Sequence, residues 1–316
     1  MLRETDAEIF LDYLASQETA QQFLAGCYQD MNDIDAEMKS YENVQAFIHY
    51  IAYGREMYAQ SKKIPKSIQP ILLFYGTCHM LKACLLTCRP DYPEQTSQLA
   101  HGASARKRKR KNYTFREDEV KVQHQGLFPY VSRHLFHVQH MTEEKLRMDA
   151  LLQILPDMLP LFRFMKEERL VRIGCIQESE WLLPASLLDG HQVTWKTLLN
   201  RLRPHLPNFS TEEDSIGMKL VLDEQPHWPH GPYIFSDLTG NLYIPANKGP
   251  ATAMPEVMVH YLLLYNLSMI SRYETEWWGD LFALKSDLDY PLISSFLDMT
   301  AKKLPLLLAT WLYLKK

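Results

Sequence analysis

The chain has 316 residues, of which 46% are hydrophobic and 23% charged, and this balance is typical of a soluble globular protein. It excludes a fibre, a disordered tail and a small disulfide-stabilised protein. The net charge is −4, but the charges are unevenly distributed. Residues 1–60 hold three Lys or Arg against eleven Asp or Glu, whereas residues 101–111 hold six Lys or Arg and no acid. Such asymmetry indicates a charged partner or contact between the two regions.

The termini and the apolar stretches give expectations about location. No basic segment followed by an apolar one opens the chain, so we expect no signal peptide. The apolar stretches near residues 262–264 and 304–314 are interrupted within about 15 residues, short of the roughly 20 that span a bilayer. The last stretch is better explained as a helix that closes the core than as a membrane-surface anchor. We therefore expect a cytoplasmic protein without membrane contact.

The first third of the chain is predicted to be helical. Thr5 with Glu8 forms a capping pair that marks the first helix, and apolar spacing predicts helices at 18–28, 43–61 and 68–88. The helix at 68–88 is apolar on almost all faces, so we expect it at the centre of the core. Proline, glycine and serine predict a loop over residues 89–112.

The rest of the chain mixes strands and helices. Short β-like pieces at 113–115 and 120–122 predict a hairpin, and Thr142 is expected to start a helical stretch. Further strands are predicted at 170–176, 218–222, 233–235 and 241–244, and further helices at 194–202, 255–273, 292–302 and 306–314.

These elements predict an α+β fold that is predominantly α-helical, with a small antiparallel β insertion, and a HEPN-like arrangement is one form that the helical part could take. We expect three regions: an N-terminal helical one with the basic loop and hairpin (1–165), a mixed one with the small sheet (166–250), and a C-terminal helical one (251–316). The first and last are expected to pack together as one core.

The basic run is the sharpest feature of the sequence, because adjacent like charges gain by contacting phosphate oxygens and releasing counterions. Its members are Arg106, Lys107, Arg108, Lys109, Arg110 and Lys111. Tyr113 and Phe115 follow at alternate positions, so on a strand both rings would share one face and stack a base. His101, Gly102 and Ser104 precede the run in a segment whose N–H groups are candidates for a phosphate cradle. The alternative is a solvated loop neutralised by the acidic N-terminal helices.

Several spaced motifs carry a family resemblance. They are the basic run with Tyr113-x-Phe115, Asp118-Glu119-Val120-x-Val122, Gly126-Leu127-Phe128-Pro129, Pro70-x3-Phe74-Tyr75-Gly76, and Tyr265-Asn266-Leu267-Ser268-Met269-x2-Arg272-Tyr273. Over nearly the whole chain this order resembles the YaaC-like proteins of Bacillus and related Gram-positive bacteria. The resemblance implies a bacterial cytosolic protein and assigns no cofactor or catalytic residue.

A ribonuclease is the alternative that names catalytic residues. Helical HEPN ribonucleases use an Arg followed by a His at a short spacing, and here Arg133 and His140 are separated by six residues. With 15 Arg and 12 His in the chain, about two such pairs arise by chance, so the pair is weak support. His137 is a further candidate on the same segment. Walker, GxGxxG, HExxH and GxSxG motifs are absent from the sequence.

Two other clusters have plain structural explanations. Cys78 lies six residues before Cys84, so it falls on a different helix face from Cys84 and Cys88, and we expect buried thiols without a metal site. Arg272 follows a very apolar stretch, which predicts a partly buried guanidinium paired with Glu276, although an anion site is the alternative.

The sequence therefore predicts a non-catalytic binder of a phosphate-bearing partner, RNA or a nucleotide, without a cofactor. Its expected ligand-binding residues are His101, Ser104, the six basic residues of the run, Tyr113 and Arg272. A homodimer is possible, and a protein-interaction module that uses the acidic and basic regions is the second alternative.

Overall fold

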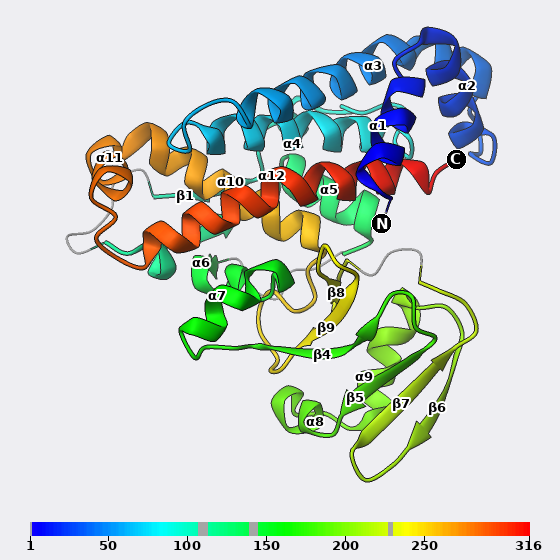
Figure 1. Ribbon diagram of the computed structural model, residues 1–316. Coiled ribbons are helices and arrows are strands. Elements are labelled where there is room, and N and C mark those ends of the chain that lie inside the picture. Colours follow the sequence, from blue (N-terminus) through cyan, green and yellow to red (C-terminus); the bar gives the residue numbers. More distant parts are fainter. Residues whose placement is uncertain (1, 107–112, 139–144, 227–229) are drawn as a thin grey trace. The chain divides into compact units, whose positions relative to one another are not determined.

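The computed structural model describes residues 2–106, 113–138, 145–226 and 230–316. Within these residues the protein is mostly helical, with three small antiparallel sheets in the strand orders β1-β2-β3, β4-β9-β8 and β5-β7-β6 (Figure 1). This confirms the predicted α+β class. Among the helices that the structure describes, none is both long and apolar enough to cross a membrane.

The chain divides into two compact units. One comprises Met1–Thr114, Glu119–Lys145 and His260–Lys316, and the other comprises Phe115–Asp118 and Leu146–Val259. The first is built from helices, and its short strands β1 (Ala103–Ala105) and β2 (Glu119–Val122) pair antiparallel. Its helices are α1 (Glu4–Tyr13), α2 (Gln17–Tyr28), α3 (Ala36–Ser61), α4 (Gln69–Leu86), α5 (Leu127–Phe136), most of α10 (Glu256–Tyr273), α11 (Thr275–Leu284) and α12 (Asp289–Tyr313).

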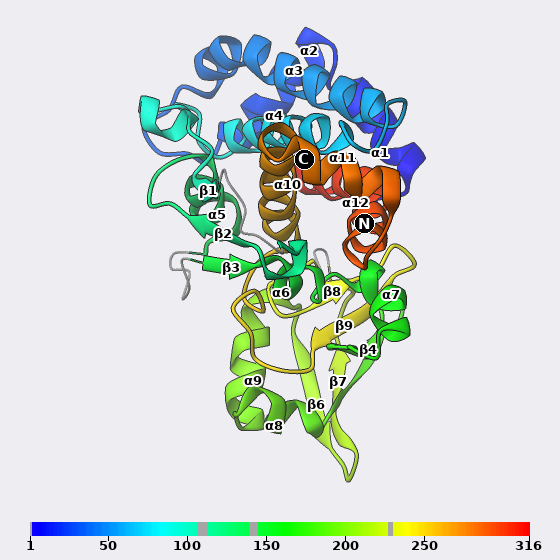
Figure 2. The same cartoon turned by 90° about the vertical axis from the view of Figure 1, so that its left-hand side faces the viewer.

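The core of the helical unit forms around α4. This helix packs along α3 and also contacts α12 and α5, as the side-by-side ribbons of α3 and α4 in Figures 1 and 2 illustrate. Leu73, Leu81 and Leu85 have no exposed surface, which confirms the predicted central position of this helix. Burying such leucines contributes about 1.5–3 kcal/mol each, so packing against α4 holds the unit together.

The second unit combines two sheets with short helices. Its strands are β4 (Leu170–Cys175), β5 (Glu180–Pro184), β6 (Phe209–Glu213), β7 (Gly217–Leu222), β8 (Phe235–Ser236) and β9 (Asn241–Pro245), and its helices are α6 (Met148–Leu152), α7 (Leu159–Phe164), α8 (Ser186–His191) and α9 (Trp195–Leu202). The short strand β3 (Lys145–Arg147) lies at the boundary between the units. A shared core that includes Trp181, Leu198, Leu220 and Leu242 joins β5, β7 and β9 to α9.

Several local predictions are wrong. Helix α1 begins at Glu4 with Arg3 as N-cap and no side-chain cap, so Thr5 lies inside the first turn. Residues 113–115 form no strand, because β2 pairs instead with β1, from the segment predicted as a loop. The two predicted C-terminal helices are one helix, α12, with Pro305 inside it. The predicted start of a helix at Thr142 lies outside the described residues.

The HEPN-like expectation finds no support in this fold. Arg133 lies on α5, which ends at Phe136, and His137 follows in the left-handed region with φ of 56°. The helix that carries Arg133 therefore stops before position 140, and His140 lies outside the described residues. The pair on which a ribonuclease would depend is not built by this helix.

Candidate functional site

One face of the otherwise apolar helix α4 carries polar side chains. Tyr75, His79 and Lys82 lie at i, i+4 and i+7, so they share this face, and all three are half-buried. The Lys82 Nζ lies 5.6 Å from the ring centre of Tyr50 on α3. The His79 ring lies 5.6 Å from that of Tyr53, which is 56% exposed. The face therefore presents a cation among accessible aromatic rings.

His101 lies against the same part of α4, two residues before β1. Its ring centre is 4.9 Å from that of Phe74 and 5.8 Å from that of Tyr75. On the other side, it is 5.9 Å from the ring of Tyr265 on α10. Its backbone carbonyl accepts a 2.7 Å hydrogen bond from the hydroxyl of Tyr261, also on α10. The histidine is thus held between two long helices while its side chain stays half-buried.

Arg272, in the last turn of α10, is exposed, and its guanidinium makes only local contacts. Its Nε donates a 2.8 Å hydrogen bond to the carbonyl of Ser268, one turn back. Glu276, the expected partner, lies in α11 and forms no ion pair with it. Over the described parts of the chain no carboxylate pairs with Arg272. The prediction of a partly buried Arg272–Glu276 pair is wrong, because α10 ends at Tyr273 and the two residues no longer share one helix.

Arg272 and Lys82 both act electrostatically on His101. Burial lowers the pKa of His101 below its ordinary value, and the positive charges of Arg272 and Lys82 lower that pKa further. Lys82 also forms no ion pair with a described carboxylate. An anion at this place would thus meet two cations whose charges are not neutralised by acids. We call the group Tyr75, His79, Lys82, His101 and Arg272, together with the buried Tyr265 that packs against His101, the cationic–aromatic surface.

The basic run begins close to this surface. Arg106 is exposed and follows β1 directly, five residues after His101. The expected ligands Lys107, Arg108, Lys109, Arg110 and Lys111 lie outside the described residues. Ser104 sits in β1 opposite Lys121, and its hydroxyl accepts a 2.6 Å hydrogen bond from Gln123. Strand pairing therefore engages the backbone around Ser104, which does not form an open cradle of N–H groups.

The predicted stacking pair of Tyr113 and Phe115 is wrong. Phe115 is fully buried in a 3₁₀ turn, Phe115–Glu117, so its ring is not available to a base. Tyr113 is half-buried, and its ring packs edge-on against Trp277 at 4.7 Å. Without a strand at 113–115, the alternation on which the shared face depended does not exist.

Arg133 of the ribonuclease alternative lines a separate polar pocket of about 370 Å³, together with Arg89, Glu94, Tyr130 and His134. Tyr130 donates a 2.8 Å hydrogen bond to Glu94 and accepts one of 3.1 Å from Arg89, which also pairs with Glu94. Burial and the charges of Arg89 and Arg133 lower the pKa of His134. The Arg89–Glu94–Tyr130 network satisfies its own members and serves to hold the segment before β1 against α5.

A buried serine, histidine and glutamate meet in the second unit without forming a catalytic triad. Ser236 Oγ lies 3.0 Å from His230 Nδ1, and Glu256 Oε2 lies 3.8 Å from the same nitrogen. A triad needs the nucleophile and the acid on opposite ring nitrogens. All three side chains also have no exposed surface, so this cluster is part of the core.

The sequence interpretation missed Tyr75, His79, Lys82 and Tyr265. A signal was present, because three polar residues at i, i+4 and i+7 in an apolar helix indicate one solvent-facing stripe. Of the expected ligands, Arg272 acts electrostatically on His101, while Ser104 and Tyr113 make contacts of their own.

Comparison with known proteins gives one result. A protein-family model described as YaaC-like Protein matches residues 12–312, which is almost the whole chain. No match is found among curated proteins or among solved structures. The match covers every element of the cationic–aromatic surface, and the chain belongs to the YaaC-like protein family.

Proposed function

We propose that the protein binds a nucleotide unit, free or within single-stranded RNA, at the cationic–aromatic surface, and that it does so without catalysing a reaction. The observation that carries the proposal is that His101 packs between α4 and α10, the helices that carry Lys82 and Arg272, and that neither cation has a carboxylate partner in the described chain. A phosphate monoester dianion between them would balance both charges, whereas one phosphodiester of RNA would balance one of them. Such charge-assisted hydrogen bonds are roughly twice as strong as neutral ones.

The aromatic rings supply the second part of the recognition. Tyr75 and His79 are half-buried and Tyr53 is exposed, so each presents some ring surface to a ligand. Stacking a base on an aromatic ring contributes about 1–3 kcal/mol and tolerates every base. Phosphate contacts beside such rings are the usual combination at single-stranded nucleic-acid sites.

The basic run is expected to extend this surface. It starts five residues after His101, and extended chain covers at most about 3.6 Å per residue, so Arg106 lies within about 18 Å of His101. The six positive charges of the run would contact successive phosphates of an RNA strand but only one phosphate group of a free nucleotide. RNA should therefore bind more tightly than AMP.

The test is a binding titration of a short fluorescein-labelled single-stranded RNA, and separately of AMP, with the wild type and the double variant Lys82→Met/Arg272→Met. We expect the affinity of the variant for both to be at least about tenfold lower, since removing a hydrogen bond to a charged group costs about 1.5–3 kcal/mol. For RNA, the slope of log K against log salt should fall by about 0.7 for each phosphate that the variant no longer neutralises.

The matched control is Lys63→Met/Lys316→Met, which removes two exposed cations away from this surface. It should bind as the wild type does. Equally weakened binding in both double variants would show that only net charge matters and would contradict the proposed site. RNA recovered intact after incubation is the expected sign of binding without cleavage.

A further inference from the structure

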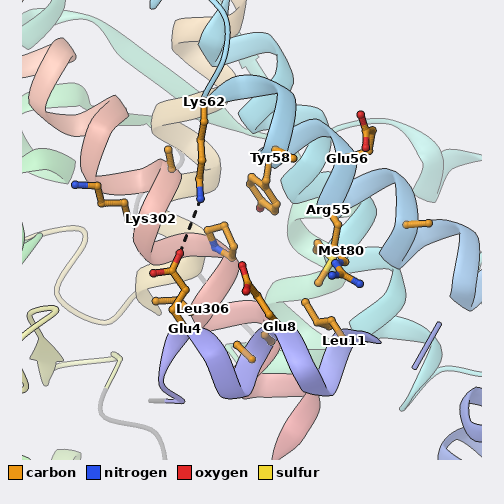
Figure 3. Close-up of a pocket in the computed structure, with 16 residues that line it drawn as sticks. Glu4, Glu8, Leu11, Arg55, Glu56, Tyr58, Lys62, Met80, Lys302 and Leu306 are labelled. Carbon is orange, nitrogen blue, oxygen red and sulfur yellow. Dashed lines mark ion pairs between the residues drawn. The ribbon is translucent and has the colours of Figure 1, made fainter. Parts of the chain in front are cut away.

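A separate cavity of about 420 Å³ lies in the helical unit between α1, α3 and α12 (Figure 3). Its volume falls within the range of small-molecule sites, about 300–1,000 Å³. None of its lining residues belongs to the cationic–aromatic surface. The floor is apolar and includes Leu11, Met80 and Leu306, while charged side chains stand around it.

The cavity exists because small residues face one another where the three helices meet. On α3 and its C-cap, the lining residues Ala52, Arg55, Glu56, Ala59 and Lys62 follow helical spacing, so they form one stripe. Alanines also line it from α1 and α12, as Ala7, Ala301 and Ala309. Large side chains at these positions would fill the space, whereas methyl groups leave it open to a ligand.

The charged side chains around the cavity differ in how well they are paired with opposite charges. Arg55 is paired with Asp12 at 2.7 Å. Lys62 pairs with Glu4 only at 3.9 Å, which is beyond hydrogen-bond distance. Glu8 has no ion-pair partner in the described chain. Figure 3 shows Lys62 reaching from α3 toward α1 and Glu8 pointing from α1 toward α3.

We propose that this cavity binds a small amphipathic zwitterion, of the class of α-amino acids with an apolar side chain. The ligand's ammonium group would pair with the carboxylate of Glu8. The ligand's carboxylate would form an ion pair with the Lys62 ammonium, whose contact with Glu4 is long. Its apolar side chain would lie on the floor formed by Leu11, Met80 and Leu306, where burial is favourable.

Glu8 and Lys62 carry opposite charges above the apolar floor, so the site should prefer a zwitterion to a ligand with only one of the two charges. An apolar amine leaves Lys62 without the ligand's carboxylate, and an N-acylated amino acid leaves Glu8 without an ammonium group. Each omission removes one charge-assisted hydrogen bond, which corresponds to about tenfold or more in affinity. L-leucine should therefore bind more tightly than 3-methylbutylamine or N-acetyl-L-leucine, which lack one charge each.

Isothermal titration calorimetry of the full chain with L-leucine, L-methionine and the two leucine analogues tests the proposal. Ala59→Leu places an isobutyl group in the cavity and should abolish the binding of both amino acids. Its control is Ala46→Leu, an exposed position of the same helix outside the cavity. Glu8→Gln should weaken binding about tenfold, and Glu18→Gln, an exposed glutamate of α2, should not.

Each result of these titrations either supports or overturns the proposed amino-acid site. Saturable binding of the amino acids that Ala59→Leu removes, with the two analogues at least about tenfold weaker, supports the proposal. The absence of heat with both amino acids, equal binding of 3-methylbutylamine, or unchanged binding by Ala59→Leu would each overturn it. RNA binding by Ala59→Leu reports that the variant is folded, and thermal melting serves the same purpose if RNA does not bind.

Discussion

The hydroxyl of Tyr261 donates a 2.7 Å hydrogen bond to the backbone carbonyl of His101, which lies 160 residues earlier in the chain. Tyr261 has no exposed surface, so this bond lies in the interior of the helical unit. It ties the segment before β1 to α10, the helix that also carries Arg272. The position of His101 relative to Arg272 thus depends on a buried tyrosine that contacts no solvent.

Tyr261→Phe should lower the free energy of unfolding by about 1 kcal/mol and also weaken nucleotide binding. The ring still packs, but the carbonyl of His101 loses this donor and keeps the 3.1 Å hydrogen bond from the Phe128 N–H. Urea unfolding followed by circular dichroism measures the first effect and the RNA titration measures the second. Tyr41→Phe, at a tyrosine that is 66% exposed, is the control and should change neither. Unaltered stability of Tyr261→Phe would show that the hydrogen bond contributes nothing.

Arg272→Met should change the free energy of unfolding by no more than about 0.5 kcal/mol. The Arg272–Glu276 pair that the sequence predicts would instead give a decrease of several kcal/mol, because a stranded acidic partner is costly. In the structure the guanidinium is exposed, and its Nε bonds only the Ser268 carbonyl of its own helix. Thermal melting without ligand measures the effect. A decrease of about 3 kcal/mol or more is the order expected for a broken buried pair, and it would show that Arg272 is held in a buried ion pair after all.

Binding of RNA, whose phosphodiesters stay ionised, should strengthen as the pH falls from about 7.5 to about 6, because His101 gains a proton. In the free protein, the pKa of His101 is lowered by burial and by the charges of Arg272 and Lys82, so the ring is neutral at about pH 7. A phosphate anion placed among these groups favours the protonated ring, and binding therefore takes up a proton. Titrations at several pH values, in buffers with different ionisation enthalpies, detect that uptake.

For stability the same shift acts in the opposite direction. The unfolded chain binds a proton at His101 near pH 6.5, while the folded state binds it only at lower pH because its pKa is depressed. The contribution of His101 to stability is therefore complete above about pH 6.5 and disappears as the pH falls through the folded pKa. His101→Gln should reduce the pH dependence of binding, and His49→Gln, at an exposed histidine, should leave it unchanged. Identical pH profiles for wild type and His101→Gln would contradict this role.

Arg106→Ala/Arg108→Ala/Arg110→Ala should weaken RNA binding and flatten its salt dependence, with melting temperature nearly unchanged. Exposed charges contribute little to folding, whereas each neutralised phosphate releases counterions. The control removes three exposed lysines of the other compact unit, Lys166, Lys196 and Lys248. Equal RNA affinity of the arginine variant and the wild type would exclude the basic run from the site. AMP affinity should fall less than RNA affinity.

Local pattern predicted most long helices correctly, since α4 and α10 each follow from apolar spacing between clear ends. It failed where distant contacts override a local signal. Pro305 predicts a break, but it removes only one backbone hydrogen bond, and the buried Leu304, Leu307 and Leu308 keep α12 continuous. The pairing of β1 with β2 joins residues on both sides of the basic run, which no local pattern reveals.

The candidate site was predicted only in part for the same reason. Composition identified the basic run and His101 as candidates, because charge is visible in the sequence. Lys82 and Tyr265 were missed, since their proximity to His101 depends on how α4 and α10 pack. Arg272 was identified, but with a partner that the end of α10 places out of reach.

Gly126→Ala should destabilise the protein by about 3 kcal/mol, among the larger effects of a single substitution. Gly126 has φ of 120°, a conformation that residues with a side chain rarely adopt. A Cβ there would also lie 2.5 Å from the Cα of Gly102, the residue that follows His101. Two backbones cross at this point, and neither can move away without shifting His101 or the start of α5.

The matched control is Gly279→Ala in α11, where a Cβ would meet nothing within 4 Å. Alanine favours a helix over glycine by about 1 kcal/mol, so this variant should be as stable as the wild type or slightly more so. Urea unfolding of both variants measures the contrast. If Gly126→Ala folds with wild-type stability, the crossing is looser than the geometry requires. The RNA affinity of Gly126→Ala then shows whether His101 has moved, because a shifted His101 should weaken RNA binding even when the fold is retained.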